Sequence, residues 1–323
     1  MAEQIELPRS KVGTSGHPAV VAWSRLYTLP SAPPQISVLK KRFKSTIYQI
    51  KGLEPTASSV VAKHCRREVA AHERFVYEKI LRSLPVTSPQ YYGFVEGDGD
   101  YDWLFLEYVE GERYSRERQD HSVLAGSWLG LLHTSGEHTA AAIRLPDLGA
   151  QHYLALLRSA RAKFCRNLEL LNLPREELAV VNAVILQCNF LESHWDRIEQ
   201  WCGRMPRTLV HGDFKPRNVV IRTATDGTDL LAFDWEASGR GVPAEDLAYV
   251  DLSAYHTVVK CYWPAVSVHD LERMKALGRI FRGLSEFSWE SIKFDPNWEV
   301  STVKLQIYQT RMAEAIAMAK WRE

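Results

Sequence analysis

Three residues with oxygen-bearing side chains follow one another at spacings that suit phosphoryl transfer. Residues 211–218 read HGDFKPRN, so Asn218 comes five residues after Asp213, and Asp234 comes sixteen residues after Asn218. Phosphoryl transfer requires a carboxylate that orients or deprotonates the attacking hydroxyl, and an Asn and an Asp that hold magnesium against the phosphates. These residue types in this order predict magnesium-dependent phosphoryl transfer from ATP.

The surrounding chain predicts how these side chains are brought together. An apolar run precedes the loop, and Gly212 permits the backbone angles of a tight turn. Two further apolar runs, 219–221 and 230–233, are separated by a polar stretch with Asp-Gly, a strong hairpin signal. Such a hairpin returns Asp234 to the neighbourhood of Asn218. Each of these residues taken singly is also typical of a turn or a strand end, so the prediction depends on the ordered set.

The ordered set resembles the catalytic loop of the aminoglycoside phosphotransferase and choline kinase family, small-molecule kinases that share the two-lobed fold of protein kinases. The HGDxxxxN run carries the resemblance, which covers about residues 60–320 and has sharp motifs only in its second half. It implies that Asp213 is the catalytic base and that Asn218 and Asp234 bind Mg²⁺. Asp246 would be the aspartate commonly found shortly after the metal site.

The same resemblance implies an α+β, bilobal, protein-kinase-like fold. Its small N-lobe would hold an antiparallel sheet plus one helix, and its larger C-lobe would be mainly helical. We expect an N-terminal nucleotide-binding lobe over residues 1–106, of which 1–35 form an irregular leader. A hinge is expected over 107–111, and a C-terminal catalytic and acceptor-binding lobe over 112–323.

The first half of the chain offers a lysine and a glutamate for the nucleotide. A kinase of this type needs a lysine on a strand to hold the phosphates, and a helix glutamate to hold that lysine. Lys63 ends a short, partly β-branched run, and three-and-four spacing in the next predicted helix places Glu73 on an apolar stripe. Since an unpaired buried carboxylate is costly, we expect Glu73 to pair with Lys63. Glu68 is the competing partner, and a Glu73 that reaches water from the edge of the stripe is the other alternative.

An apolar strand at 103–106 runs into the sequence EYVEG. This resembles the hinge of the family, where backbone groups near Glu107 and Val109 would form hydrogen bonds with an adenine ring. An ordinary strand that ends at a glycine turn explains the same stretch equally well.

The phosphate-covering loop departs from the protein-kinase pattern, because no GxGxxG sequence precedes Lys63. The corresponding turn is 40–46, KKRFKST. Its basic side chains, its backbone amides and the hydroxyls of Ser45 and Thr46 could contact phosphates without glycine. A solvated basic hairpin tip is the alternative.

Two features bear on the acceptor. Asp246 follows Asp234 by only twelve residues, which leaves little room for the activation segment of protein kinases. Lys215 matches the protein-kinase loop, where a lysine two places after the base approaches the transferred phosphate, and is a secondary catalytic candidate beside the alternative of surface solvation. We therefore expect an ATP- or GTP-dependent phosphotransferase that acts on a small-molecule alcohol. A protein kinase and a non-catalytic nucleotide-binding module are the alternatives.

Aminoglycosides and choline are cationic, so a pocket for them requires carboxylates or aromatic faces. Near the C-terminus the chain offers a cluster of such residues, namely Glu286, Trp289, Glu290, Asp295, Trp298 and Glu299. This cluster is a candidate acceptor pocket. A solvated face with two core tryptophans explains it as well, and sugars, amino alcohols and nucleoside antibiotics all stay open as acceptors.

Composition excludes several other classes of protein. The 323 residues suit one bilobal catalytic unit, and 46% hydrophobic residues can fill its core. A formal net charge of +1 indicates no nucleic-acid partner, and no segment suggests a membrane span or a secretory signal. Five cysteines without CxxC spacing are predicted to be buried thiols. We expect a cytoplasmic enzyme that is a monomer or a homodimer.

Overall fold

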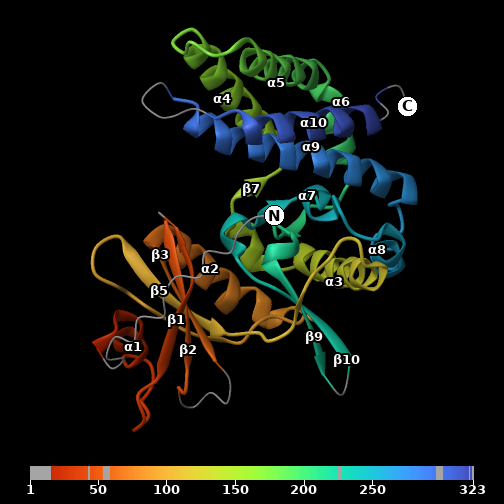
Figure 1. Cartoon of the computed structure of the whole chain (residues 1–323). Helices are drawn as coiled ribbons and strands as arrows, with labels where there is room; N and C mark the ends of the chain where they lie inside the picture. Colours follow the sequence, from red (N-terminus) through yellow and green to blue (C-terminus); the bar gives the residue numbers. More distant parts are fainter. Residues whose placement is uncertain are drawn as a thin grey trace. The chain divides into compact units, whose positions relative to one another are not determined.

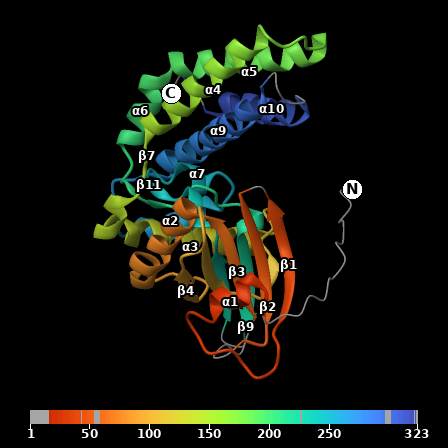
Figure 2. The ribbon, with the colours of Figure 1, turned by 90° about the vertical axis from the view of Figure 1, so that its left-hand side faces the viewer.

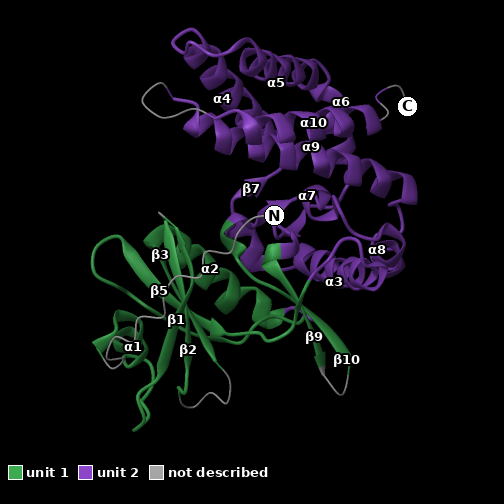
Figure 3. Ribbon diagram, viewed as in Figure 1, with its two compact units in different colours: residues 1–83, 87–113, 217–236 green, residues 84–86, 114–216, 237–323 purple. Residues whose placement is uncertain are grey.

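The computed structural model describes residues 16–42, 44–53, 59–224, 227–295, 301–319 and 321. Parts of the sequence predictions lie outside these ranges, namely residues 1–15 of the expected leader, Phe43 of the basic turn, Asp226, Trp298 and Glu299. The chain divides into two compact units (Figure 3). Unit 1 comprises residues 1–83, 87–113 and 217–236, and unit 2 comprises 84–86, 114–216 and 237–323. The predicted lobes are each one continuous stretch of the chain, and their boundaries stay a prediction.

Unit 1 is built on a five-stranded antiparallel sheet with the order β1-β2-β3-β5-β4 (Figure 1). Its strands are β1 (Gln35–Arg42), β2 (Ser45–Lys51), β3 (Val60–Arg66), β4 (Tyr91–Val95) and β5 (Tyr101–Glu107). Helix α2 (Arg67–Lys79) follows β3 directly and packs on β3, β4 and β5. The short helix α1 (Pro18–Trp23) contributes Trp23 to the core of this unit, where the centroids of the Trp23 and Phe105 rings are 5.3 Å apart.

The predicted hairpin is also part of unit 1. Strands β9 (Val219–Ala224) and β10 (Gly227–Ala232) pair in antiparallel register, with Ala232 opposite Val219. The two-residue strand β6 (Glu112–Arg113) pairs with β9 on its other edge. The hairpin therefore brings the two ends of the 219–232 stretch together, which is what its apolar pattern and Asp-Gly turn predict.

Unit 2 is mainly helical (Figure 2). Its helices are α3 (Gln119–Glu137), α4 (Ala150–Leu168), α5 (Arg175–Ser193), α6 (Trp195–Gly203), α7 (Ala244–Leu247), α8 (Leu252–Val259), α9 (Val268–Lys293) and α10 (Val303–Met318). Helix α9 packs against α4, α7 and α10, and begins with a capping box of Ser267 and Asp270. Since α9 packs on so many elements, it fixes the arrangement of the helical unit.

A small sheet in unit 2 supports the loop that follows it. Strand β11 (Gly239–Gly241) lies between β7 (Asp147–Leu148) and β8 (Thr208–Val210), parallel to the first and antiparallel to the second. All three residues of β8 are buried, as the apolar run before the HGD sequence predicts. The loop 211–216 therefore leaves the sheet from a fixed, buried strand.

Two expectations from composition can be compared with the structure. Cys165 and Cys261 are exposed, so the prediction that all five cysteines are buried thiols is wrong for these two; Cys165 lies on the outer face of α4. No helix within the described residues is long and apolar enough to cross a membrane.

Candidate active site

Lys63 and Glu73 form a buried ion pair in unit 1. Lys63 lies on β3 and Glu73 on α2, and Lys63 Nζ is 2.9 Å from Glu73 Oε1. The two residues are 6% and 1% exposed, so neither charge could be buried without the other. Glu68, the competing partner, is exposed in the first turn of α2. The periodicity of the helix therefore identified the glutamate that faces the lysine.

Asp234 completes this cluster from the end of the β9–β10 hairpin. The amide of Phe233 donates to the carbonyl of Asn218 at 3.0 Å, so the residue that precedes Asp234 is bonded directly to Asn218. Asp234 Oδ1 is 2.7 Å from Lys63 Nζ. Its backbone has a φ of 68°, in the left-handed region that Asp adopts more readily than most residues. Such strain persists where the surrounding structure holds the residue in place, and it often marks functional sites.

The charge of Lys63 is stabilised by this arrangement. Burial opposes the charged ammonium, but the nearby carboxylates of Glu73 and Asp234 outweigh that effect and hold the pKa of Lys63 well above its usual value. One cation thus faces two carboxylates. Asn218 is 2% exposed, and its amide oxygen and the Asp234 carboxylate are hard oxygen donors. Mg²⁺ in nucleotide sites takes one or two such protein ligands together with phosphates and water, so this donor set fits magnesium.

The predicted hinge residues lie at the end of β5. The Glu107 amide donates to Gln90 at 2.8 Å, and the Tyr108 amide donates to Ser59 at 2.9 Å. The Glu107 carboxylate accepts hydrogen bonds from the Gln90 amide and from Arg222 on β9, each at 3.0 Å. Val109 follows and is half-buried. The side chain of Glu107 therefore holds the hairpin against β5, and adenine contacts by the backbone of Glu107 and Val109 stay a prediction.

Ser45 and Thr46 begin β2, just after the tip of the β1–β2 hairpin, and both are half-buried. They pair with Cys65 and His64 across β3. In β1 the register shifts between Val38 and Lys40, a bulge that sets the direction of the basic stretch. Burial lowers the pKa of Lys40, and the nearby Asp234 carboxylate partly offsets this effect. The ammonium of Lys40 therefore interacts electrostatically with the Asp234 carboxylate. The phosphate contacts predicted for Ser45 and Thr46 stay a prediction.

In unit 2 the HGD loop is fixed by Asp246. The amides of His211 and Gly212 donate to the two carboxylate oxygens of Asp246 at 2.7 and 3.0 Å. Gly212 has a φ of 73°, and a Cβ there would be 2.2 Å from the carbonyl oxygen of Ala237. Only glycine fits this position without moving the backbone. The turn that the sequence predicts at Gly212 is thus bonded to Asp246 and packed against the backbone of Ala237.

A histidine that the sequence did not link to the loop holds Asp246 in turn. His133 on α3 is fully buried, with Nε2 3.2 Å from Asp246 Oδ2 and Nδ1 3.0 Å from the Tyr255 hydroxyl. Burial raises the pKa of Asp246, but the His133 contact and the backbone hydrogen bond of His211 outweigh it and hold that pKa below its usual range. His133 is 113 residues from Asp246, so no local spacing could reveal the contact.

Asp213 lies between two cations. Lys215 Nζ contacts Asp213 Oδ1, and Arg282 Nη2 on α9 is 3.6 Å from the same oxygen. Asp213 and Lys215 are 8% and 6% exposed, so Lys215 is not a solvated surface lysine. Arg282 is a second residue that sequence reasoning missed, because it comes from a helix 69 positions further along the chain. The loop and α9 together hold a buried carboxylate beside two positive charges.

The chain between Asp234 and Asp246 is short and ordered into elements. It contains the turn of 3₁₀ helix at Trp235–Ala237, then β11, and then α7, which carries Asp246 itself. Within these described residues there is no extended segment of the kind that protein kinases use to bind a peptide. The twelve-residue interval between Asp234 and Asp246, which argued against a protein acceptor, thus consists of short helices and a strand.

The predicted cationic-acceptor cluster is only partly brought together. Glu286 is buried, with Oε1 3.7 Å from Arg282 Nε, and Glu290 forms an ion pair with Lys293 at 2.8 Å. The ring of Trp289 has Lys215 Nζ at 5.7 Å from its centroid. In the described part of α9, the two glutamates and the Trp289 ring therefore already lie beside lysine or arginine side chains of the protein.

A strand lysine paired with a helix glutamate, a His-Gly-Asp loop and an aspartate at the end of a hairpin define the class of phosphotransferases with a protein-kinase-like fold. Residues 42–257 match the Phosphotransferase enzyme family. Since this span is more than half of the 323 residues, the chain belongs to that family.

Solved structures share the fold at low sequence identity. The GDP and kanamycin complex of APH(2")-IIia is 16% identical with a TM-score of 0.63, over 92% of this chain and 97% of that one. Spectinomycin phosphotransferase APH(9)-Ia, in complex with ADP and spectinomycin, is 11% identical with a TM-score of 0.59, over 91% and 95%. The ethanolamine kinase of Plasmodium vivax is 13% identical with a TM-score of 0.57, over 88% and 82%. Among curated proteins there is no match.

Proposed function

We propose that this protein transfers the γ-phosphoryl group of ATP or GTP to a hydroxyl of a small molecule. The observation that carries the proposal is the buried Asp213 carboxylate, on a loop whose two preceding amides are held by Asp246. A loop fixed in this way positions a carboxylate for a substrate hydroxyl, which is the main task of the protein in phosphoryl transfer. The GDP and ADP in the similar structures support a nucleotide donor.

In this proposal each unit supplies part of the chemistry. Lys63, held by Glu73, positions the phosphates of the nucleotide in unit 1. Magnesium on Asn218 and Asp234 would neutralise phosphate charge when it is bound there. In unit 2, Asp213 accepts the proton of the attacking hydroxyl. The bond from the acceptor oxygen to the γ-phosphorus forms as the bond to the bridging oxygen breaks, and the nucleoside diphosphate leaves with that electron pair.

Lys215 is proposed to assist Asp213. Its ammonium contacts the carboxylate and can move to the transferred phosphoryl group, where negative charge must be balanced. The hinge backbone near Glu107 and Val109 is proposed to hold the adenine ring. Ser45 and Thr46 are proposed to cover the phosphates from the β1–β2 hairpin.

The proposal is tested with a panel of alcohols incubated with labelled ATP or GTP and Mg²⁺. The panel includes aminoglycosides, choline, sugars and hydroxy acids, with a protein mixture as a separate arm. Stimulated nucleotide turnover and a phosphorylated alcohol are expected. Phosphorylation of protein alone would overturn the proposal in favour of a protein kinase. Nucleotide binding without any product across the panel would favour a non-catalytic module.

A further inference from the structure

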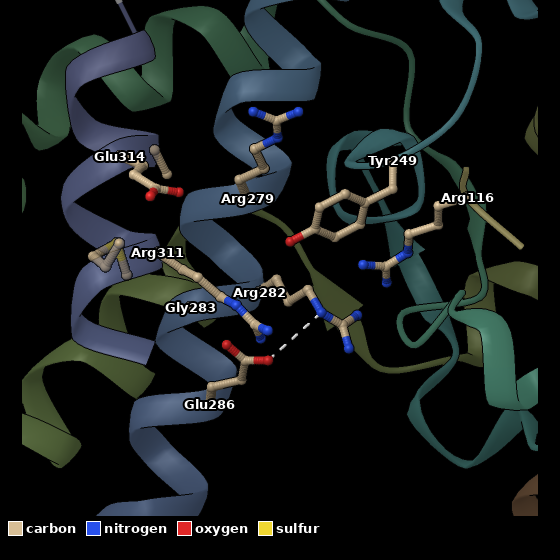
Figure 4. Close-up of a pocket in the computed structure, with 10 residues that line it drawn as sticks. Arg116, Tyr249, Arg279, Arg282, Gly283, Glu286, Arg311 and Glu314 are labelled. Carbon is tan, nitrogen blue, oxygen red and sulfur yellow. Dashed lines mark ion pairs between the residues drawn. The ribbon is translucent and has the colours of Figure 1, made fainter. Parts of the chain in front are cut away.

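Unit 2 contains a cavity of about 190 Å³ that is rich in arginine (Figure 4). It lies between α9, α10 and the residues around 116 and 249. The charged residues that line it are four arginines and two glutamates: Arg116, Arg279, Arg282, Arg311, Glu286 and Glu314. Cations therefore outnumber carboxylates by two. This is the opposite of the polarity that a cationic acceptor requires.

Arg282 is buried, Arg116 and Arg279 are half-buried beside one aromatic ring, and Arg311 is exposed on α10. The guanidinium of Arg116 lies 3.7 Å from the centroid of Tyr249, and that of Arg279 lies 5.7 Å from the same ring. Arg116 Nε is buried and, among the described residues, has no hydrogen-bond partner. Burial lowers the pKa of Arg116, and Arg282 is a further positive charge that disfavours its charged form. A buried, unpaired donor of this kind is costly unless a ligand accepts from it.

The glutamates do not neutralise the cavity. Glu286 lies beside Arg282, and the side chain of Arg311 also points toward it in Figure 4. Glu314 is exposed on α10. Glu286 therefore faces Arg282, Arg311 and Arg116, and a single carboxylate cannot balance three positive charges.

The cavity borders the proposed catalytic base. Arg282 lines the cavity, and its Nη2 is 3.6 Å from Asp213 Oδ1. A group bound in the cavity would thus be one arginine side chain away from Asp213, within the reach of a small molecule. The volume is below the roughly 300–1,000 Å³ of sites for drug-sized ligands, so it suits a compact group rather than a whole aminoglycoside.

We infer that the acceptor is a small alcohol with an anionic oxygen group, a carboxylate or a phosphate, which the cavity binds through Arg116 and Arg311 while its hydroxyl faces Asp213. This rests on the proposed function. Arginine presents a planar fork of donors that matches the oxygens of carboxylates and phosphates. The unsatisfied donor of Arg116 and the excess of positive charge both favour such a ligand.

Binding to the full-length protein tests the inference without any need for turnover. Isothermal titration calorimetry would compare glycerate and glycerol 3-phosphate with glycerol and choline. At least one anionic compound should bind roughly 10-fold or more tightly than glycerol, as expected for a charged hydrogen bond. A preference between the two identifies carboxylate or phosphate. Equal affinity for glycerol and both anions, or tighter binding of choline, would overturn the inference.

Substitutions of single arginines test whether the anion binds in this cavity. Arg116→Gln and Arg311→Gln should each weaken binding of the preferred anion by roughly 10- to 100-fold. Arg116→Lys keeps the charge but not the fork and should restore only part of the affinity. Arg273→Gln removes an arginine from the same helix, α9, outside the cavity, and should leave binding unchanged. Thermal melting checks that each variant is folded. Unchanged affinity in a folded Arg116→Gln protein would overturn the inference.

Turnover of the same four compounds with ATP and Mg²⁺ separates the two proposals. Phosphorylation of an anionic alcohol supports both. Phosphorylation of choline in preference to the anions supports the proposed function and overturns the inference. Anion binding that the arginine variants abolish, with no product from any alcohol, supports the anion site and counts against the proposed function.

Discussion

The nucleotide-side cluster of unit 1 and the cavity of unit 2 are both built from buried charges, but with opposite excess. In unit 1, Lys63 faces two carboxylates, Glu73 and Asp234. In unit 2, four arginines line a cavity with two glutamates. An excess of carboxylate suits a metal ion, and an excess of guanidinium suits an anion. The sign of the charge excess therefore distinguishes the ligands that we propose for the two regions: a metal ion for the first and an anion for the second.

The largest expected effect concerns Asp213, the proposed catalytic base in unit 2. Asp213→Ala should lower turnover by roughly 10² to 10⁴, because the hydroxyl loses its proton acceptor, while nucleotide binding should be largely unchanged. Steady-state kinetics and nucleotide titration measure the two quantities. Asp196→Ala, an exposed aspartate of α6 in the same unit, is the matched control. Unchanged turnover in Asp213→Ala would remove its role as the base.

In unit 1, the comparison predicts that the buried pair serves chemistry rather than stability. Lys63→Met should lower the free energy of unfolding by about 3–5 kcal/mol, because it leaves the Glu73 carboxylate buried and uncompensated. The double variant Lys63→Met with Glu73→Leu should regain most of that stability and stay inactive. Urea denaturation of both, with the exposed Lys51→Met as control, measures this. A double variant as unstable as the single one would contradict the prediction.

Asp246 should show a pH-dependent contribution to stability. Asp246→Asn should lower the free energy of unfolding by about 1.5–3 kcal/mol at neutral pH, because two loop amides lose a charged acceptor. The folded pKa of Asp246 lies below its usual value, so this contribution is present above a pH of about 4 and is lost as the pH falls through the folded pKa. Denaturation curves of both proteins should therefore converge in acid. A gap that widens in acid would contradict this.

The smallest expected effect tests how α9 is positioned. A Cβ at Gly278 would be 1.9 Å from the carbonyl oxygen of Ala244 on α7, so Gly278→Ala should cost about 1–3 kcal/mol of stability and weaken anion binding. At Gly283 a Cβ would meet the flexible side chain of Met312, whose terminal methyl group is at 2.5 Å and can move away. Gly283→Ala should therefore cost less. Thermal melting of the two variants, with nucleotide binding as an unaffected reference, checks the difference.

Sequence spacing predicted the parts of the site that local structure determines. Lys63 and Glu73 are ten residues apart, and strand and helix periods are enough to face them toward each other. Asn218 and Asp234 are joined by a hairpin whose turn has its own signal. In each case the contact is made within one supersecondary motif, and the residue pattern of that motif is visible in the sequence.

The remaining contacts depend on tertiary packing, which the sequence does not show. His133 reaches Asp246 from another helix, and Arg282 reaches Asp213 from α9. The predicted cationic-acceptor cluster counted the carboxylates near the C-terminus but not their neighbours, so the arginine beside Glu286 was overlooked. Sequence identifies the chemistry of a family from its motifs, but the polarity of an acceptor cavity depends on residues that only the fold assembles.

The close approach of α9 to α7 at Gly278 distinguishes substitutions that would disturb the catalytic loop from substitutions that would change only the acceptor cavity. Because the backbone there is fixed against the segment that carries Asp246, the loop with Asp213 is anchored independently of the side chains further along α9. Positions 279 and 286 can therefore be exchanged between lineages, together with 311 on the adjoining helix, without rebuilding the catalytic loop, whereas Arg282 contacts Asp213 itself. Relatives that retain the HGD loop should differ most at these positions, and those differences should track the charge of the acceptor.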